Sequence, residues 1–184
     1  MEKTISLRNN FIFVNNDKYE VIKHNLTGQS SNIYITKDKK YVFKKVFSVL
    51  LNDISTNLDD YNIFEREVYL LQLLNKNVLW VPKLISYDIK NKIIMTEYCG
   101  ERLNRKNKPL NLKSQLLKIY NELNILNIQH NDIKVDQEIL ILNGEVSICD
   151  WGWGSINKNH SCNINLWNGN KPYGIIEDRN ILKI

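Results

Sequence analysis

The chain of 184 residues carries 25 Lys and Arg against 20 Asp and Glu, a formal charge of +5, and 43% of its residues are hydrophobic. This composition is ordinary for a folded globular protein, and a chain of this length needs no disulfide or metal to stabilise its core. No apolar run is long enough to span a bilayer, and the N-terminal MEKTISLRNN lacks the charged-then-apolar order of a secretion signal.

Three scattered cysteines, Cys99, Cys149 and Cys162, favour reduced thiols and therefore an intracellular, cytoplasmic location. The chain contains no alanine, and Lys outnumbers Arg by 20 to 5. Both features are typical of an AT-rich genome. A basic pI of about 9.0 is therefore weak support for a nucleic-acid partner, which the sequence leaves open.

The first half of the chain predicts strands with one helix. Residues that are β-branched or aromatic indicate strands at 11–14, 19–24, 32–36, 41–47, 82–88 and 92–98. Between these sets, the apolar residues of 63–74 recur at helical spacing.

The second half predicts a helix over 112–128, because its apolar residues repeat at intervals of three and four. A polar loop, QHNDIKVDQ, precedes a hairpin with strands 138–142 and 145–149, whose Asn143-Gly144 pair suits a two-residue turn. The tail is polar and irregular. This order predicts an α+β protein with one domain over 1–98 and a second over 99–184.

Two aspartates flank the predicted hairpin. Asp132 lies in the loop before it, and Asp150 follows its second strand. Because a tight hairpin returns the chain on itself, we expect the two carboxylates to lie close together. One such carboxylate can accept a proton from a hydroxyl while the other holds Mg²⁺. Two loop aspartates, one of them capping a turn, fit the same pattern.

A lysine and a glutamate lie on faces that we expect to be buried. Lys44 shares a strand face with Val42, and Glu67 is in line with the apolar residues of helix 63–74. Burying an unpaired charge costs free energy, so we expect the two to pair over a bound phosphate. The alternative is a lysine that reaches solvent and a glutamate at the edge of its helix face.

These features occur in an order that resembles the eukaryotic-type protein-kinase family over about residues 20–154. The order is a loop of small residues (GQSS, 28–31), the strand Lys44, the helix Glu67, a strand ending in TEYC, a helix, HNDIK, a hairpin and DWG. The resemblance implies a two-lobed fold, with an antiparallel N-lobe sheet and one helix above a reduced helical C-lobe. It also implies a serine/threonine protein kinase that requires ATP and Mg²⁺.

The resemblance implies individual roles as well. Asp132 would be the catalytic aspartate, and Lys134 would steady the γ-phosphate. Asp150 would bind Mg²⁺, with Gln137 in place of the second metal-binding asparagine. The implied ATP site consists of Gly28, Ser30, Ser31, Val42, Lys44, Glu67, the gatekeeper Thr96, and the backbone of Glu97 and Cys99.

Several positions depart from the family pattern. Gln137 is one methylene longer than asparagine, which weakens the expected second metal site. Asn131 replaces the arginine that reads a phosphorylated activation loop in many members, so switching by loop phosphorylation is not expected. About thirty residues follow DWG, too few for the usual substrate-docking helices, although Glu177 and Asp178 faintly match the family's Pro-Glu segment. This economy is similar to that of the RIO kinases and the kinase of the KEOPS complex.

The sequence therefore leaves several functions open. The leading interpretation is an active kinase for a protein substrate, with an activating or scaffold protein as a candidate partner. A pseudokinase acting as a regulatory binding module is the main alternative. A small-molecule kinase and an ATPase in an RNA-associated complex rank lower. His130 is expected to anchor its loop, and the tryptophans at 151, 153 and 167 are expected to pack in the core or cover the shortened lobe.

Overall fold

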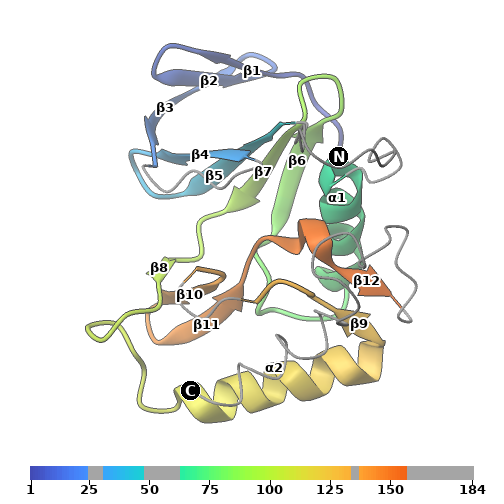
Figure 1. Cartoon of the computed structure of the whole chain (residues 1–184). Coiled ribbons are helices and arrows are strands. Elements are labelled where there is room, and N and C mark those ends of the chain that lie inside the picture. Colours follow the sequence, from blue (N-terminus) through green and yellow to red (C-terminus); the bar gives the residue numbers. More distant parts are fainter. Residues whose placement is uncertain (25–30, 48–62, 134–136, 157–184) are drawn as a thin grey trace, which may run out of the picture. The chain divides into compact units, whose positions relative to one another are not determined.

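The computed structural model describes residues 1–24, 31–47, 63–133 and 137–156. These residues form a mixed α+β protein with a mainly antiparallel sheet and two α-helices (Figure 1). The predicted α+β class is thereby confirmed. Neither of these two helices combines the length and hydropathy needed to cross a membrane.

The chain divides into two compact units. The first contains Met1–Asp53 and Leu71–Tyr98, and the second contains Ile54–Leu70 and Cys99–Ile184. One division point, after Tyr98, coincides with the predicted domain boundary. The helix α1 (Ile63–Leu74), which the sequence assigns to the first domain, is instead divided after Leu70.

Among the described residues, the first unit contains a seven-stranded antiparallel sheet. In order of pairing its strands are β1 (Ile5–Arg8), β2 (Phe11–Val14), β3 (Asp17–Lys23), β4 (Ser31–Thr36), β5 (Tyr41–Val46), β7 (Ile93–Glu97) and β6 (Leu84–Asp88). The six strands that the sequence predicts here are confirmed, with ends that differ by at most two residues. The additional strand β1 has only two apolar residues, which is too short a pattern to recognise.

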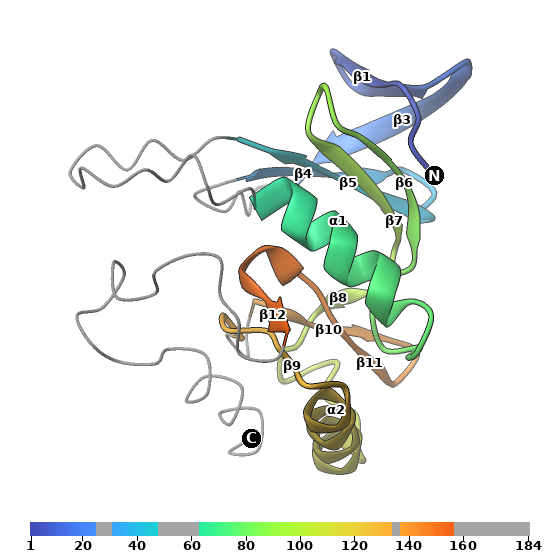
Figure 2. The same ribbon diagram turned by 90° about the vertical axis from the view of Figure 1, so that its right-hand side faces the viewer.

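This sheet closes on itself through the residues before β1. Glu2 forms a parallel bridge with Tyr87 of β6, and the Lys3 N–H donates to the Tyr87 carbonyl at 2.8 Å. The curl of the sheet is visible in Figures 1 and 2, and the sheet surrounds one apolar core. Side chains from every strand contribute to the core: Ile5, Ile12, Val14, Val21, Tyr34, Phe43, Ile85, Ile93 and Met95.

Asp88, at the end of β6, stabilises the contact between the N-terminal residues and β6 that closes the sheet. Its buried carboxylate accepts a hydrogen bond from the Ile5 N–H at 2.6 Å, and from the Asn91 backbone and side chain at 2.8 and 2.9 Å. Burial acts to raise the pKa of Asp88, but these hydrogen bonds outweigh it, so the pKa lies below its ordinary value. The ionised carboxylate is therefore part of the folded arrangement.

The second unit combines short strands with α2 (Leu112–Leu126). The strands β8 (Glu101–Arg102), β10 (Ile139–Leu142) and β11 (Glu145–Ile148) form one sheet, and β9 (Ile128–Gln129) pairs with β12 (Ser155–Ile156). The hairpin β10–β11 is confirmed, with positive φ at both of its turn residues, Asn143 and Gly144.

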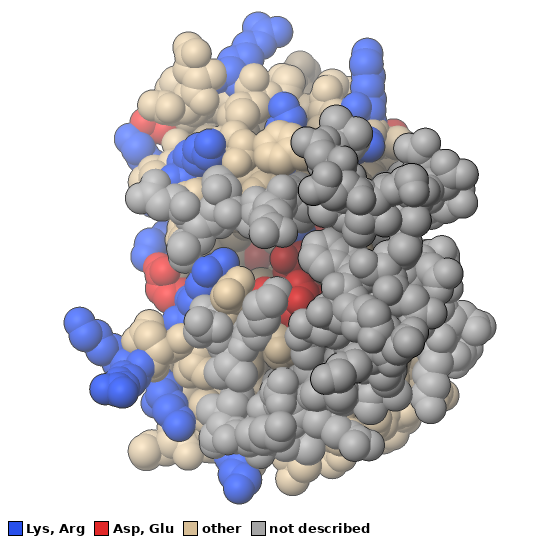
Figure 3. All heavy atoms as spheres, viewed as in Figure 1, with Lys and Arg blue, Asp and Glu red and all other residues tan. Residues whose placement is uncertain are grey.

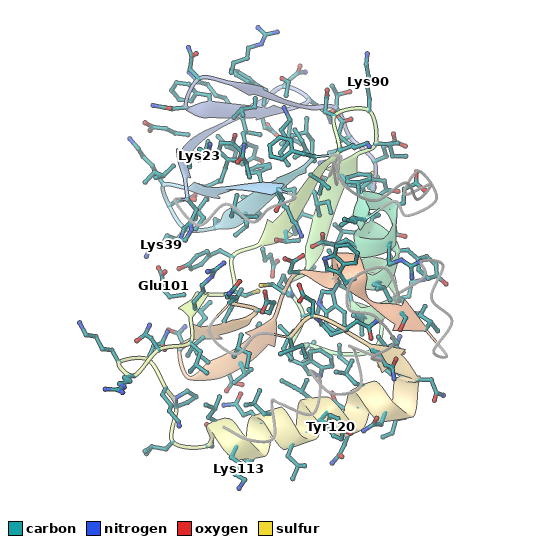
Figure 4. The ribbon with its side chains drawn as sticks, in the orientation of Figure 1. Lys23, Lys39, Lys90, Glu101, Lys113 and Tyr120 are labelled. Carbon is teal, nitrogen blue, oxygen red and sulfur yellow. The ribbon has the colours of Figure 1, made fainter. Side chains whose placement is uncertain are left out.

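Helix α2 ends two residues before its predicted end. Asn127 takes a left-handed conformation, with φ of 53°, and its N–H caps the last turn of the helix. Ile128 then begins β9. The buried face of α2 carries apolar residues at the predicted spacing, while Lys113 projects away from the helix (Figure 4).

Candidate functional site

The predicted nucleotide-binding residues of the first unit lie on two adjacent strands. In the pairing of β5 with β7, Val42 is opposite Thr96, and Lys44 is opposite Ile94. The Lys44 side chain is buried, with 8% of the residue exposed, as the sequence predicts. A buried ammonium requires a polar partner. The proposed pairing of Lys44 with Glu67 stays a prediction.

Glu97 and Ser31 are more constrained by the sheet than the sequence indicates. The Glu97 N–H donates to the Lys83 carbonyl at 2.9 Å, so an adenine contact at this residue would have to use its carbonyl. Ser31 was expected in the loop before a strand, but it is the buried first residue of β4 and pairs with Val46. Cys99 begins the part of the second unit that follows Tyr98, and it is half-buried.

Glu67 lies beside the DWG segment within the second unit. The residue is only 4% exposed, which confirms the expected burial. A Cβ atom built on Gly152 would come within 3.7 Å of the Glu67 carboxylate and 2.4 Å of the Ile63 side chain. A larger residue at this position would force the Ile63 side chain, the helix or the DWG segment to shift, so their close approach depends on glycine.

His130 ties the loop of Asp132 to the residue before Asp150. Its Nδ1 accepts the Asp132 N–H at 3.3 Å, so Nε2 carries the proton and donates to the Cys149 carbonyl at 2.8 Å. The ring is fully buried and packs edge-on against Trp151, with ring centroids 4.6 Å apart. His130 is thus the structural anchor that the sequence predicts, because both of its ring nitrogens already serve the backbone.

Further contacts besides the hairpin β10–β11 join the segment of Asp132 to that of Asp150. The His130 bridge and the pairing of β9 with β12 provide them. Both aspartates are half-buried. The separation of their carboxylates stays a prediction.

The backbone at Asp150 has an uncommon conformation. Its φ is 67°, in the left-handed region, and it leads into a 3₁₀ turn over Trp151–Trp153. The Trp151 ring is fully buried and donates from Nε1 to the Ile148 carbonyl at 3.0 Å. Trp151 therefore packs in the core, as expected. Aspartate is among the residues most often found in this region, so the turn at Asp150 is formed without unusual strain.

The two predicted metal ligands, Asp150 and Gln137, would fit Mg²⁺ only together with the phosphates of a nucleotide. Among the described residues, no three His, Cys, Asp or Glu side chains cluster closely enough to hold a metal ion. Mg²⁺ in phosphoryl-transfer sites usually takes one or two protein oxygens together with phosphates and water. Asp150 offers a carboxylate of this kind, and Gln137 is exposed in the turn before β10.

Several predicted residues fall outside the described part of the chain: Gly28, Ser30, Lys134, Cys162, Trp167, Glu177 and Asp178. Other contributors were missed by the sequence analysis. Arg66 and Ser155 contact the segment around the DWG motif, and neither belongs to a recognisable pattern. For Asn131 the residue type itself is a signal of a turn, since asparagine is among the residues most often found at positive φ, and Asn131 has a φ of 69°.

Positive charge is dispersed over the face of the molecule that Figure 3 shows. On the face shown in Figure 3, Lys and Arg side chains stand singly or in small groups. In Figure 4, Lys39 and Lys90 project from separate turns of the first unit. Neither view adds support for a nucleic-acid partner.

The sequence matches no protein-family model and no curated protein. The interpretation of the site therefore depends on its residues and their contacts.

Proposed function

We propose that the protein is a minimal kinase that uses ATP and Mg²⁺ to phosphorylate Ser or Thr on a protein substrate. In this proposal the first unit is the nucleotide-binding lobe of a kinase-like fold, and the second unit is a reduced catalytic lobe. The observation that carries the proposal is the His130 bridge, which ties the loop of the candidate base, Asp132, to the residue before the candidate metal ligand, Asp150.

In the proposed reaction Asp132 accepts the proton of the substrate hydroxyl, and the hydroxyl oxygen attacks the γ-phosphorus. The bond between that phosphorus and the β,γ-bridging oxygen breaks, and ADP departs with the bonding electron pair. Asp150 and Gln137 would hold Mg²⁺, which neutralises the charge on the phosphates when it is bound.

The remaining residues would position the nucleotide. The buried Lys44 would pair with the phosphates, and the buried Glu67 would orient it. Lys134 would stabilise the γ-phosphate. Thr96 and the Glu97 carbonyl would line the adenine site, next to Val42. The substrate, and any activating or scaffold protein, would act in the cytoplasm.

Transfer of labelled phosphate from γ-labelled ATP tests the proposal. We expect Mg²⁺-dependent labelling of a generic protein or of the chain itself, and a loss of about 100-fold or more in Asp132→Asn. Asp17→Asn is the matched control, because Asp17 is exposed on β3. Labelling by the natural sequence that is no greater than in Asp132→Asn contradicts the proposal.

A regulatory pseudokinase is the second candidate, and Gln137 is the observation that favours it. The side chain is longer than the asparagine of the family and is exposed before β10. Thermal unfolding with ATP and Mg²⁺ separates the two functions, because a ligand that binds the folded state raises its melting temperature. Stabilisation without turnover supports the pseudokinase, whereas robust turnover eliminates it.

A further inference from the structure

The segment that follows DWG is held by hydrogen bonds from two sides. Asn131, which is 6% exposed, directs its amide Nδ2 to the Trp153 carbonyl at 2.9 Å and to the Ser155 hydroxyl at 3.0 Å. The Arg66 guanidinium of α1 donates to the Gly154 carbonyl at 3.0 Å. Three consecutive residues, 153–155, are therefore fixed by side chains of the second unit.

The backbone supports the same arrangement. Ser155 pairs with Gln129 in the β9–β12 ladder, and Ser155 is fully buried. Asn131 itself has φ of 69°, which turns the chain between β9 and Asp132. The amide of Asn131 thus lies where the loop carrying Asp132 and the segment after Asp150 run side by side.

We propose that Asn131, Ser155 and Arg66 form a clamp on residues 153–155 and thereby position Asp150. This inference rests on the proposed kinase function, because it assigns Asn131 and Arg66 as positioning residues for the metal-binding aspartate. The Ser155 hydroxyl accepts a hydrogen bond inside the core, so this side chain is a fixed part of the clamp and not a site of modification.

The chemistry of the amide makes the clamp testable with a near-isosteric change. Asparagine presents two N–H donors to two oxygen acceptors. In Asn131→Asp an acceptor oxygen would face the Trp153 carbonyl, so the pair would repel while the volume stays almost the same. Asn121→Asp is the matched control, because Asn121 is exposed on α2.

Amide hydrogen exchange of residues 151–156 is the first measurement, since it requires neither ATP nor activity. We expect Asn131→Asp to accelerate exchange there by about tenfold or more, as loss of a buried hydrogen bond predicts. Ser155→Ala, which leaves the Trp153 contact in place, should give a smaller acceleration. A double-variant cycle uses Asn131→Ala, Ser155→Ala and the combination of the two. The acceleration in the double variant should be smaller than the product of the accelerations in the single variants, because both changes remove the same contact between Asn131 and Ser155.

Exchange in this segment that is unchanged in both Asn131→Asp and Ser155→Ala overturns the clamp. If Asn131→Asp does not fold, Ser155→Ala and the double-variant cycle decide the question on their own. This readout is independent of catalysis. If the exchange measurements support the clamp but the protein transfers no phosphate, the kinase proposal is overturned and the clamp is not.

Steady-state kinetics is the second measurement. We expect Asn131→Asp to lower kcat by about tenfold or more at saturating ATP and Mg²⁺, while ADP affinity measured without Mg²⁺ stays within about twofold. A purely structural role would weaken both quantities together.

Discussion

The two units of the molecule hold their strands together by different means. In the first unit, seven strands share a single apolar core and close into a curled sheet. In the second, strands of two to four residues are connected by side chains that bond to backbone groups, among them His130 and Asn131. Apolar burial is non-directional, whereas hydrogen bonds fix distance and angle. The unit that carries Asp132 and Asp150 thus adds directional contacts to an apolar core of its own, which includes Leu116, Ile139 and Trp151.

The largest effect should come from opening the core of the curled sheet. Phe43 is fully buried on β5, and Phe43→Ala should lower the free energy of unfolding by about 3–5 kcal/mol. Urea denaturation measures this change. Phe47→Ala is the matched control, because Phe47 is 40% exposed and should cost much less. Equal losses in the two variants would mean that the strands do not share one core.

Breaking the closure should have the next largest effect. In Asp88→Asn one carboxylate oxygen becomes an amide that faces the donors of Ile5 and Asn91, and we expect a loss of about 2–3 kcal/mol. Thermal unfolding measures it, with Asp17→Asn as the exposed control. A variant as stable as the natural protein would show that the closure does not depend on Asp88.

The same carboxylate predicts a pH dependence. The pKa of Asp88 is lower in the folded than in the unfolded chain, so its stabilising contribution is complete above the unfolded pKa of about 4. It is lost as the pH falls through the lower, folded value. Melting temperatures between neutral and acidic pH should therefore decline less steeply below about pH 4 in Asp88→Asn. Parallel curves of melting temperature against pH for the two proteins would argue against an ionised Asp88 carboxylate at the closure of the sheet.

In the second unit, removing the His130 bridge should have a moderate effect on stability. His130→Ala eliminates two hydrogen bonds and the ring contact with Trp151, and we expect a loss of about 2 kcal/mol. Near-ultraviolet circular dichroism should report the altered packing of Trp151. His24→Ala in the first unit, where the side chain is half-buried, serves as the control. An unchanged tryptophan signal would exclude the bridge as the organiser of this segment.

The smallest effect should come from the link between α2 and the hairpin. Gln115 donates to the Gly144 carbonyl at 2.7 Å and accepts from the Val146 N–H at 2.9 Å. Gln115→Ala should cost about 1 kcal/mol. Gln115→Glu should cost at least as much, because one carboxylate oxygen still accepts from Val146 while the other would face the Gly144 carbonyl and repel it. Thermal unfolding ranks the three proteins. A glutamate variant as stable as the natural protein would mean that the contact with Gly144 contributes nothing.

Local patterns predicted the elements of this protein well. The spacing of apolar residues gives the bounds of α1 without error, and Asn143-Gly144 identifies the hairpin turn. The end of α2 was placed too late, because Ile128 continues the apolar pattern while Asn127 already takes a left-handed conformation. The burial of Lys44 and Glu67 was also predicted, since both share a face with apolar neighbours.

The sequence by itself determined the strands, the helices, the turn residues and the order in which the candidate catalytic residues occur. Only the tertiary structure decided which distant groups meet. The Ile5 N–H reaches Asp88 across 83 positions, and Asn131 reaches Ser155 across 24. The first contact depends on the curl of the large sheet, and the second on the pairing of β9 with β12. Both arrangements arise from the burial of a whole core, and a short stretch of sequence does not reveal them.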